Sequence, residues 1–142
     1  SNEKRKKLLL NRIHNIIGKN IKNKNIVFLG VTFKPNTDDM RDSVSVTMIP
    51  YLHKKGARIK YYDPTGLKKE FMKLKNCKFH NQINDACKDA DLVILHTEWD
   101  EFKSLDFRKV VKNKKFTLYD LRNLYSLEEM KKRKIKYFSI GR

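Results

Sequence analysis

The chain has 142 residues, 39% of them hydrophobic, which is enough for one compact domain and leaves no room for a second full domain. Its formal net charge of +17 raises nucleic acid or a membrane surface as a partner. The basic residues, however, are spread along the chain and are not interleaved with aromatic side chains as a base-stacking surface requires. We therefore expect solvated lysine-rich faces, with no nucleic acid and no membrane as partner.

Cysteine usage and apolar runs indicate the compartment. The two cysteines, Cys77 and Cys87, have neither metal-knuckle nor redox-pair spacing, and the four histidines show no metal-binding spacing either. No uninterrupted apolar run approaches the length of a bilayer span, and the charged N-terminus does not resemble a signal peptide. We expect a soluble, cytoplasmic protein without a metal site.

The first elements alternate between helix and strand. Apolar residues at helical spacing predict an amphipathic helix over residues 4–19, and its charged opening suggests that the helix begins upstream of the chain. A β-branched apolar run predicts a strand buried on both faces over residues 25–31. A second apolar stripe predicts a helix over 44–56, and the next strand covers 58–62.

The alternation continues to the C-terminus. The remaining predicted elements, in chain order, are a helical piece over 67–74, a strand over 77–80, a small helix over 83–88, strands over 91–95 and 116–120, a helix that Ser126 and Glu129 open with capping-box spacing and that runs to about 134, and a last strand over 135–140. This order favours an α/β fold: a doubly wound parallel sheet of about six strands, preceded by an N-terminal helix.

Polar segments that follow strands are the place to look for function, because ligands of such sheets bind outside the carboxyl ends of the strands. The first strand-to-helix crossover, residues 30–41, carries Gly30 alone and lacks the glycine fingerprint that lets a pyrophosphate approach the backbone. Lys34 and Arg41 suit an anion held by side chains. An alternative stays open, in which three aspartates cap the next helix and pair with those cations. These aspartates are Asp38, Asp39 and Asp42.

Two further strand ends carry candidates. Arg122 follows the strand over 116–120, where its planar fork would clasp a phosphate, unless it is a surface arginine paired with a neighbouring acid. His96 follows the strand over 91–95, and we interpret the nearby Trp99 as a packed structural indole.

Four segments resemble one known family. Residues 30–41, with the core Phe-Lys-Pro-Asn-Thr-Asp-Asp at 33–39, resemble the C-terminal domain signature of the UDP-glucose and GDP-mannose dehydrogenase family. Residues 97–106 and 120–125 resemble its UDP-glucose dehydrogenase branch, and Tyr-Asp-Pro at 62–64 also fits. Leu121 departs from the pattern, since the family usually has glycine there.

The resemblance implies a Rossmann-like UDP-sugar-binding domain over residues 25–142, preceded at 1–24 by the end of the central linking helix around which the family dimerises. It implies part of an enzyme that oxidises UDP-glucose to UDP-glucuronate with NAD. The family's catalytic cysteine and its main NAD-binding domain lie before this chain. We therefore expect no catalytic residue here, and no activity from the chain alone.

The resemblance also assigns roles. Phe33 and Lys34 contact the UDP-sugar, Arg122 meets the UDP portion, and Arg41 approaches the NAD held mainly by the N-terminal domain. The implied partners are UDP-glucose or UDP-glucuronate, that N-terminal domain, and a second copy in a homodimer. Two alternatives remain: a sister dehydrogenase for UDP-N-acetylmannosamine or GDP-mannose, and a basic nucleic-acid-binding module.

Overall fold

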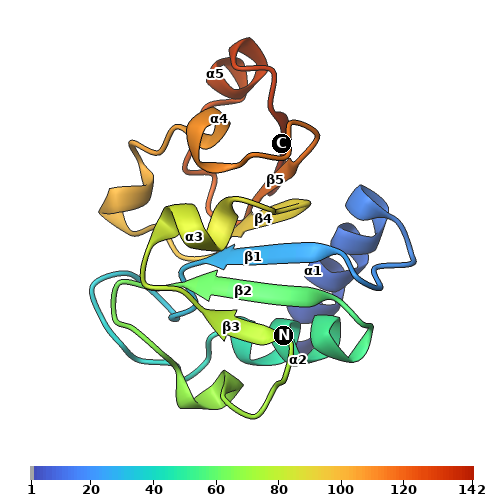
Figure 1. Ribbon diagram of the computed structural model, residues 1–142, viewed down its shortest axis with the longest axis vertical. Coiled ribbons are helices and arrows are strands. Elements are labelled where there is room, and N and C mark those ends of the chain that lie inside the picture. The colour runs from blue at the N-terminus through green and yellow to red at the C-terminus, as the bar shows by residue number, and fades with distance from the viewer. Residues whose placement is uncertain (1) are drawn as a thin grey trace.

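A six-stranded parallel sheet runs through the computed structural model, which describes residues 2–142 (Figure 1). The strand order is β3-β2-β1-β4-β5-β6. The strands are β1 (Asn25–Leu29), β2 (Arg58–Tyr62), β3 (Cys77–Phe79), β4 (Leu92–Leu95), β5 (Thr117–Asp120) and β6 (Lys136–Ser139). The predicted doubly wound sheet of about six strands with a leading helix is confirmed.

The helices are mostly short. They are α1 (Asn2–Ile17), α2 (Ser45–Lys54), α3 (Ile83–Cys87), α4 (Phe107–Val110) and α5 (Leu127–Lys132), with single 3-10 turns η1 (Lys69–Phe71) and η2 (Asp100–Phe102). Ser126 caps α5 as predicted, since its Oγ accepts the Glu129 N–H at 3.0 Å. No helix in the described part of the chain is long and apolar enough to span a membrane.

One helix prediction is wrong, and two short helical elements were missed. The expected helical piece over 67–74 is only the 3-10 turn η1, while η2 and α4 were not predicted at all. The reason is length, because an element of three or four residues is too short to display a helical period. The cap of α4 is nevertheless visible in the sequence: Asp106 accepts the Arg108 N–H at 3.1 Å.

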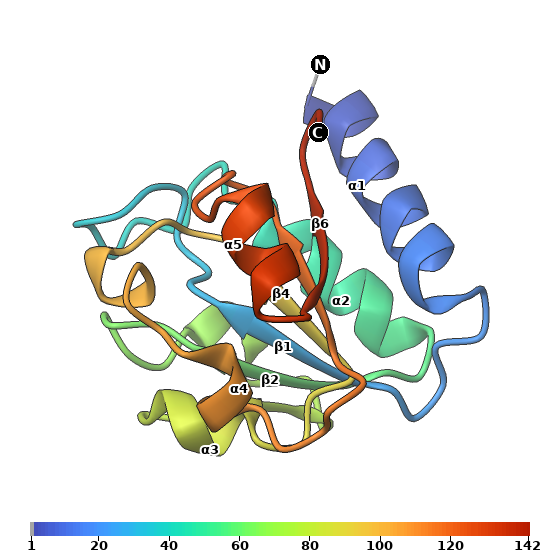
Figure 2. The ribbon, with the colours of Figure 1, turned by 90° about the horizontal axis from the view of Figure 1, so that it is seen from above.

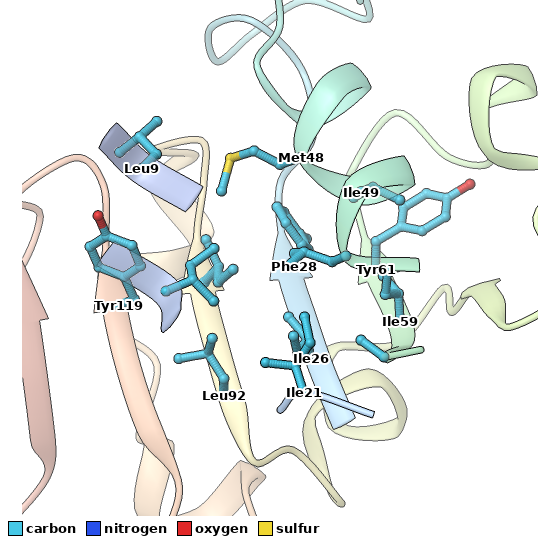
Figure 3. Packing of buried hydrophobic residues seen from close by; sticks show 14 of the residues in the cluster. Leu9, Ile21, Ile26, Phe28, Met48, Ile49, Ile59, Tyr61, Leu92 and Tyr119 are labelled. Carbon is cyan, nitrogen blue, oxygen red and sulfur yellow. The ribbon is translucent and has the colours of Figure 1, made fainter. Parts of the chain in front are cut away.

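Helices cover both faces of the sheet, and each face has its own core. Figure 2 shows α1 and α2 on one side and α3 and α4 on the other. The first core joins Leu9 of α1 and Met48 of α2 to Phe28 and Tyr61 of the sheet (Figure 3). The second joins buried residues of α3, α4 and α5 to alternate residues of β1, β4 and β5. A strand that is buried on both faces needs apolar residues throughout. This explains why all four residues of β4 are apolar and buried.

The strand order sets the position of the candidate site. β1 and β4 are neighbours in the sheet although β2 and β3 separate them in the chain, so the connections leave β1 and β4 in opposite directions. Such a reversal opens a place for a ligand at the carboxyl ends of the strands. The polar segments after β1, β4 and β5 all meet there.

Candidate functional site

The backbone that leaves β1 is held by buried polar groups. The Val31 N–H donates to Asp63 Oδ2 at 2.8 Å, and the Val31 carbonyl accepts from the hydroxyls of Ser43 and Ser45, both at 2.6 Å. All four residues are buried. Because both polar groups of Val31 are satisfied, the start of the 31–44 loop has a fixed direction.

Gly30 lets the loops after β1 and β4 touch. Its φ is +77°, and a Cβ added there would lie 2.6 Å from the Cβ of Thr97. The Thr97 hydroxyl in turn donates to the Thr32 carbonyl at 2.8 Å. Gly30 therefore serves loop packing, and the space that a dinucleotide pyrophosphate would need beside it is filled by Thr97.

Arg122 ties three strand ends together. Its Nε donates to the His96 carbonyl after β4 at 2.8 Å, and its Nη2 donates to the Phe33 carbonyl after β1 at 3.2 Å. Its own backbone N–H is held by Asp120 Oδ1, at the end of β5, at 2.9 Å. The guanidinium is thereby fixed at the junction where β1, β4 and β5 end.

Part of the Arg122 guanidinium remains available for an anion. Within residues 2–142, no acceptor receives a hydrogen bond from its Nη1. The alternative of a neighbouring acid is also met, because Nε forms an ion pair with Glu98 Oε2 at 3.6 Å; the Arg122 side chain is 24% exposed. A partly desolvated, oriented guanidinium with a free donor edge is suited to a phosphate oxygen.

His96 lies buried beside this group and is uncharged. Because the Thr97 hydroxyl donates its proton to Thr32, it must accept from His96 Nδ1–H, 2.8 Å away. Nε2 is then the unprotonated nitrogen, and it has no partner in the described structure. Burial, and then the charge of Arg122, lower the His96 pKa to about 3. His96 therefore adds no positive charge to the site.

Asp120 fixes the segment that carries Arg122. Its Oδ2 accepts from the Tyr125 N–H at 3.1 Å and from the Tyr137 hydroxyl at 2.7 Å. Leu121, which stands where the resembled family has glycine, donates its N–H to the Leu95 carbonyl at 3.0 Å and buries its side chain in the first core. The leucine is thus accommodated by packing, and Arg122 remains directed at the site.

Phe33 and Lys34 lie in the 31–44 loop that follows β1. Phe33 is 47% exposed although its carbonyl accepts a hydrogen bond from Arg122, so this loop presents an apolar residue to solvent. Lys34 is exposed, and its carbonyl accepts the Thr32 hydroxyl at 3.0 Å. The structure thus brings Phe33 and Arg122 into contact and places Lys34 next to them in the chain.

Arg41 is placed differently. Its Nη2 lies 2.9 Å from Asp39 Oδ2 and its Nε lies 3.1 Å from Asp39 Oδ1, while its side chain is 88% exposed. This pairing lowers the pKa of Asp39 to about 2. Both residues line a cavity of about 440 Å³ between residues 38–41 and 67–70.

The alternative interpretation of this loop is half correct. Arg41 does pair with Asp39, but no aspartate caps the following helix, because the α2 N-cap is Val44 and has no side-chain cap bond. Within the described residues, no ion pair joins Lys34 to a carboxylate. The lysine is therefore not occupied by the interaction that the alternative required.

Sequence reasoning missed the residues that hold the site. Thr97, Ser43, Ser45 and Asp63 are all buried and all bond to the loop after β1, either directly or through its neighbours. A buried polar residue directly after a strand was the available signal, since such groups need partners. Trp99 packs against the second core as predicted.

The comparisons with known proteins converge. Residues 27–127 match the model of the UDP-glucose/GDP-mannose dehydrogenase family, UDP binding domain. The chain is 37% identical over 142 residues to the UDP-glucose 6-dehydrogenase of Rhizobium meliloti (strain 1021), covering 99% of this chain and 32% of that protein. It is 35% identical over 144 residues to the UDP-glucose 6-dehydrogenase of Rickettsia felis (strain ATCC VR-1525 / URRWXCal2), with coverages of 99% and 32%.

A solved structure shares the fold. The NDP-N-acetyl-D-galactosaminuronic acid dehydrogenase of Methanosarcina mazei Go1 superposes with a TM-score of 0.78 at 20% identity, covering 97% of this chain and 29% of that one. The chain spans about a third of the length of the curated relatives it matches.

Proposed function

This chain belongs to the UDP-glucose/GDP-mannose dehydrogenase family, and on that premise we propose that it is the UDP-sugar-binding C-terminal domain of an NAD-dependent UDP-glucose 6-dehydrogenase. Such an enzyme converts UDP-glucose, two NAD and water to UDP-glucuronate and two NADH. The domain binds the nucleotide sugar and supplies no group that reacts. Its role is to hold the diphosphate and the sugar in place against the N-terminal domain.

The observation that carries this proposal is the position of Arg122. Its guanidinium lies where β1, β4 and β5 end, with Nη1 free and with Nη2 bonded to the carbonyl of the exposed residue Phe33. A nucleotide sugar offers an anion for the guanidinium and a flat base or sugar face for the ring. Lys34 adds a mobile ammonium for a single phosphate oxygen or a sugar hydroxyl.

The cofactor NAD does not fit the first crossover of this chain. Thr97 fills the space beside Gly30, and the two further glycines of a dinucleotide fingerprint are absent. We therefore assign the main NAD site to the N-terminal domain. Arg41 is the one residue that we assign to NAD, because it stands exposed in the 31–44 loop and pairs with Asp39, away from the hydrogen bonds of Arg122.

The sugar is assigned from the relatives. Those at 37% and 35% identity act, by name, on UDP-glucose, whereas the N-acetylgalactosaminuronic acid enzyme is a likeness of fold at 20% identity.

The first core packs α1 onto the sheet with Leu9, Ile13 and Ile16. We assign the outer surface of α1 to contact with a second copy in a homodimer.

Calorimetric titration at physiological salt tests this function. UDP and UDP-glucose should bind at one site per chain, and duplex DNA should not bind tightly. The alternative basic nucleic-acid module predicts the opposite ranking, with DNA affinity that falls steeply as salt rises. Tight DNA binding without UDP binding would therefore contradict the proposal.

A further inference from the structure

A second cationic site lies at the amino ends of β1, β2 and β3. Arg122 lies at the other end of the strands, where β1, β4 and β5 finish. A cavity of about 520 Å³ opens at the amino ends, within the size range of small-molecule sites. Its cations are Arg58, Lys60 and Lys78, its one acid is Asp89, and Asn25 and Asn76 add side-chain amides. Since strands rise about 3.3 Å per residue, the five-residue β1 separates this cavity from the UDP site by roughly 13 Å.

The strand register brings two of these cations together. Lys60 of β2 is paired directly with Lys78 of β3 in the parallel ladder. Neighbouring strands lie only about 4.8 Å apart, and like charges placed opposite one another destabilise a sheet. Within residues 2–142, no ion pair joins either lysine to a carboxylate. Neither lysine is therefore neutralised by a carboxylate in direct contact.

Protection of the sheet edge does not account for this pair. Lysine on an edge strand deters pairing with another chain, which would explain Lys78 on β3. Lys60, however, lies on β2, an inner strand. Arg58 precedes it by two residues and therefore points to the same face, about 6.6 Å along the strand.

A partly buried histidine lies near the same cations. His80 follows Lys78 by two residues, and its Nε2 is buried without a partner among the described residues. Burial, and then the charge of Lys60, lower the His80 pKa; Asp85 opposes this shift, and Lys78 and Lys88 add smaller contributions in the same direction as Lys60. Several cations thus act on one point of this face.

We propose that this cavity binds a compact phosphate polyanion of the size of pyrophosphate, held by Arg58, Lys60 and Lys78. The backbone positions of these three cations are about 5 to 8 Å apart, a spread that suits two linked phosphates better than one. The side-chain amides of Asn25 and Asn76 would donate to the remaining oxygens. The anion would also remove the repulsion between the opposed lysines. This site does not depend on the assignment of UDP to Arg122.

Nuclear magnetic resonance titration with pyrophosphate tests the proposal, with saturating UDP present to occupy the Arg122 site. The wild-type chain should show amide shifts at Asn25, Lys60 and Lys78. Lys60→Gln with Lys78→Gln should weaken pyrophosphate binding at least tenfold. The control is Lys131→Gln with Lys132→Gln, which removes the same charge from exposed positions on α5 and should bind as wild type does.

A second readout uses thermal stability. Pyrophosphate should raise the Tm of the wild-type chain and leave that of the Lys60 and Lys78 double variant unchanged. Equal binding of inorganic phosphate and pyrophosphate, or an equal loss in the α5 control, would mean diffuse attraction to a chain of net charge +17 and would overturn the proposal. Failure of UDP to bind would instead contradict the proposed function and leave the shifts at Lys60 and Lys78 in place.

Discussion

Arg122 and Phe33, 89 positions apart in the sequence, are joined by a hydrogen bond of 3.2 Å from the guanidinium Nη2 to the Phe33 carbonyl. The same guanidinium donates from Nε to the His96 carbonyl at 2.8 Å. Arg122 is therefore both a candidate anion ligand and the tie between the loops after β1, β4 and β5. A substitution at this position should affect binding and stability together.

Arg122→Lys should weaken UDP binding and also lower the stability of the fold. An ammonium cannot reproduce the fork, so we expect a loss of about 1–3 kcal/mol in the free energy of unfolding and at least a tenfold loss in UDP affinity. Urea denaturation and calorimetry measure the two effects. Arg108→Lys is a matched control, because Arg108 also donates to three backbone carbonyls, those of Lys114, Arg133 and Lys134. The control should lose stability alone, and unchanged UDP affinity in a folded Arg122→Lys variant would remove the anion role.

Gly30→Ala should destabilise the chain more than Gly66→Ala. Both glycines have positive φ, +77° and +93°, so an alanine is strained at either position, at a cost of about 1–2 kcal/mol. Only at Gly30 would the new Cβ meet Thr97, at 2.6 Å, whereas nothing lies within 4 Å at Gly66. The difference between the two variants in urea denaturation should be at least about 1 kcal/mol. Equal losses would show that the loops after β1 and β4 are not in close contact.

His96 should make the folded chain less stable in mild acid. The unfolded chain takes up a proton near pH 6.5, whereas buried His96 has a pKa of about 3, so the folded state does not. The free energy of unfolding should therefore fall as pH drops below about 6.5, by up to about 1.4 kcal/mol per pH unit from this residue. Denaturation between pH 4.5 and 7 measures the slope.

Replacing His96 isolates its share of that slope. His96→Asn keeps a donor for Thr97 and should reduce the slope by the uptake of one proton. A smaller part should remain, because the pKa of His80 is also lowered. His53→Asn, at the end of α2, serves as the control. An identical slope in His96→Asn and wild type would mean that His96 is protonated in the folded chain.

Arg41→Ala should act on the cofactor. In a full-length dehydrogenase carrying this domain, we expect the KM for NAD to rise more than the KM for UDP-glucose, because Arg41 is exposed and bonded to Asp39 instead of to the Arg122 group. Lys131→Ala, on α5, is the charge-matched control. The reverse order of the two KM changes would assign Arg41 to the sugar nucleotide.

The inner strands β1, β4 and β5 were predictable because each lies in a buried and mostly apolar run. The second strand was predicted as residues 58–62, which are the bounds of β2. The helix predicted over 67–74 is wrong because only Phe71 and Leu74 of its apolar residues pack on the core, around the single 3-10 turn η1, while Leu67 and Met72 are exposed. Helix α4 was missed because its single turn depends on the Asp106 cap and on burial of Phe107, which a periodicity search does not detect.

The candidate site was predictable only in part. Arg122 was expected at the carboxyl edge because it follows a strand, and the structure places it there. The sequence could not predict that the guanidinium donates to the Phe33 and His96 carbonyls. Those hydrogen bonds join segments that only the strand order brings together. The Asp39–Arg41 pair was open to prediction because the two residues are local in sequence.

The central claim is that UDP binds where β1, β4 and β5 end, and one titration tests it most directly. Amide shifts of the isotope-labelled 142-residue chain would be followed as UDP is added. The account predicts that the largest shifts cluster at residues 30–34, 96–98 and 120–123, and that they vanish in Arg122→Ala while Arg108→Ala retains them. Shifts that cluster elsewhere, or that survive unchanged in a folded Arg122→Ala chain, would contradict it.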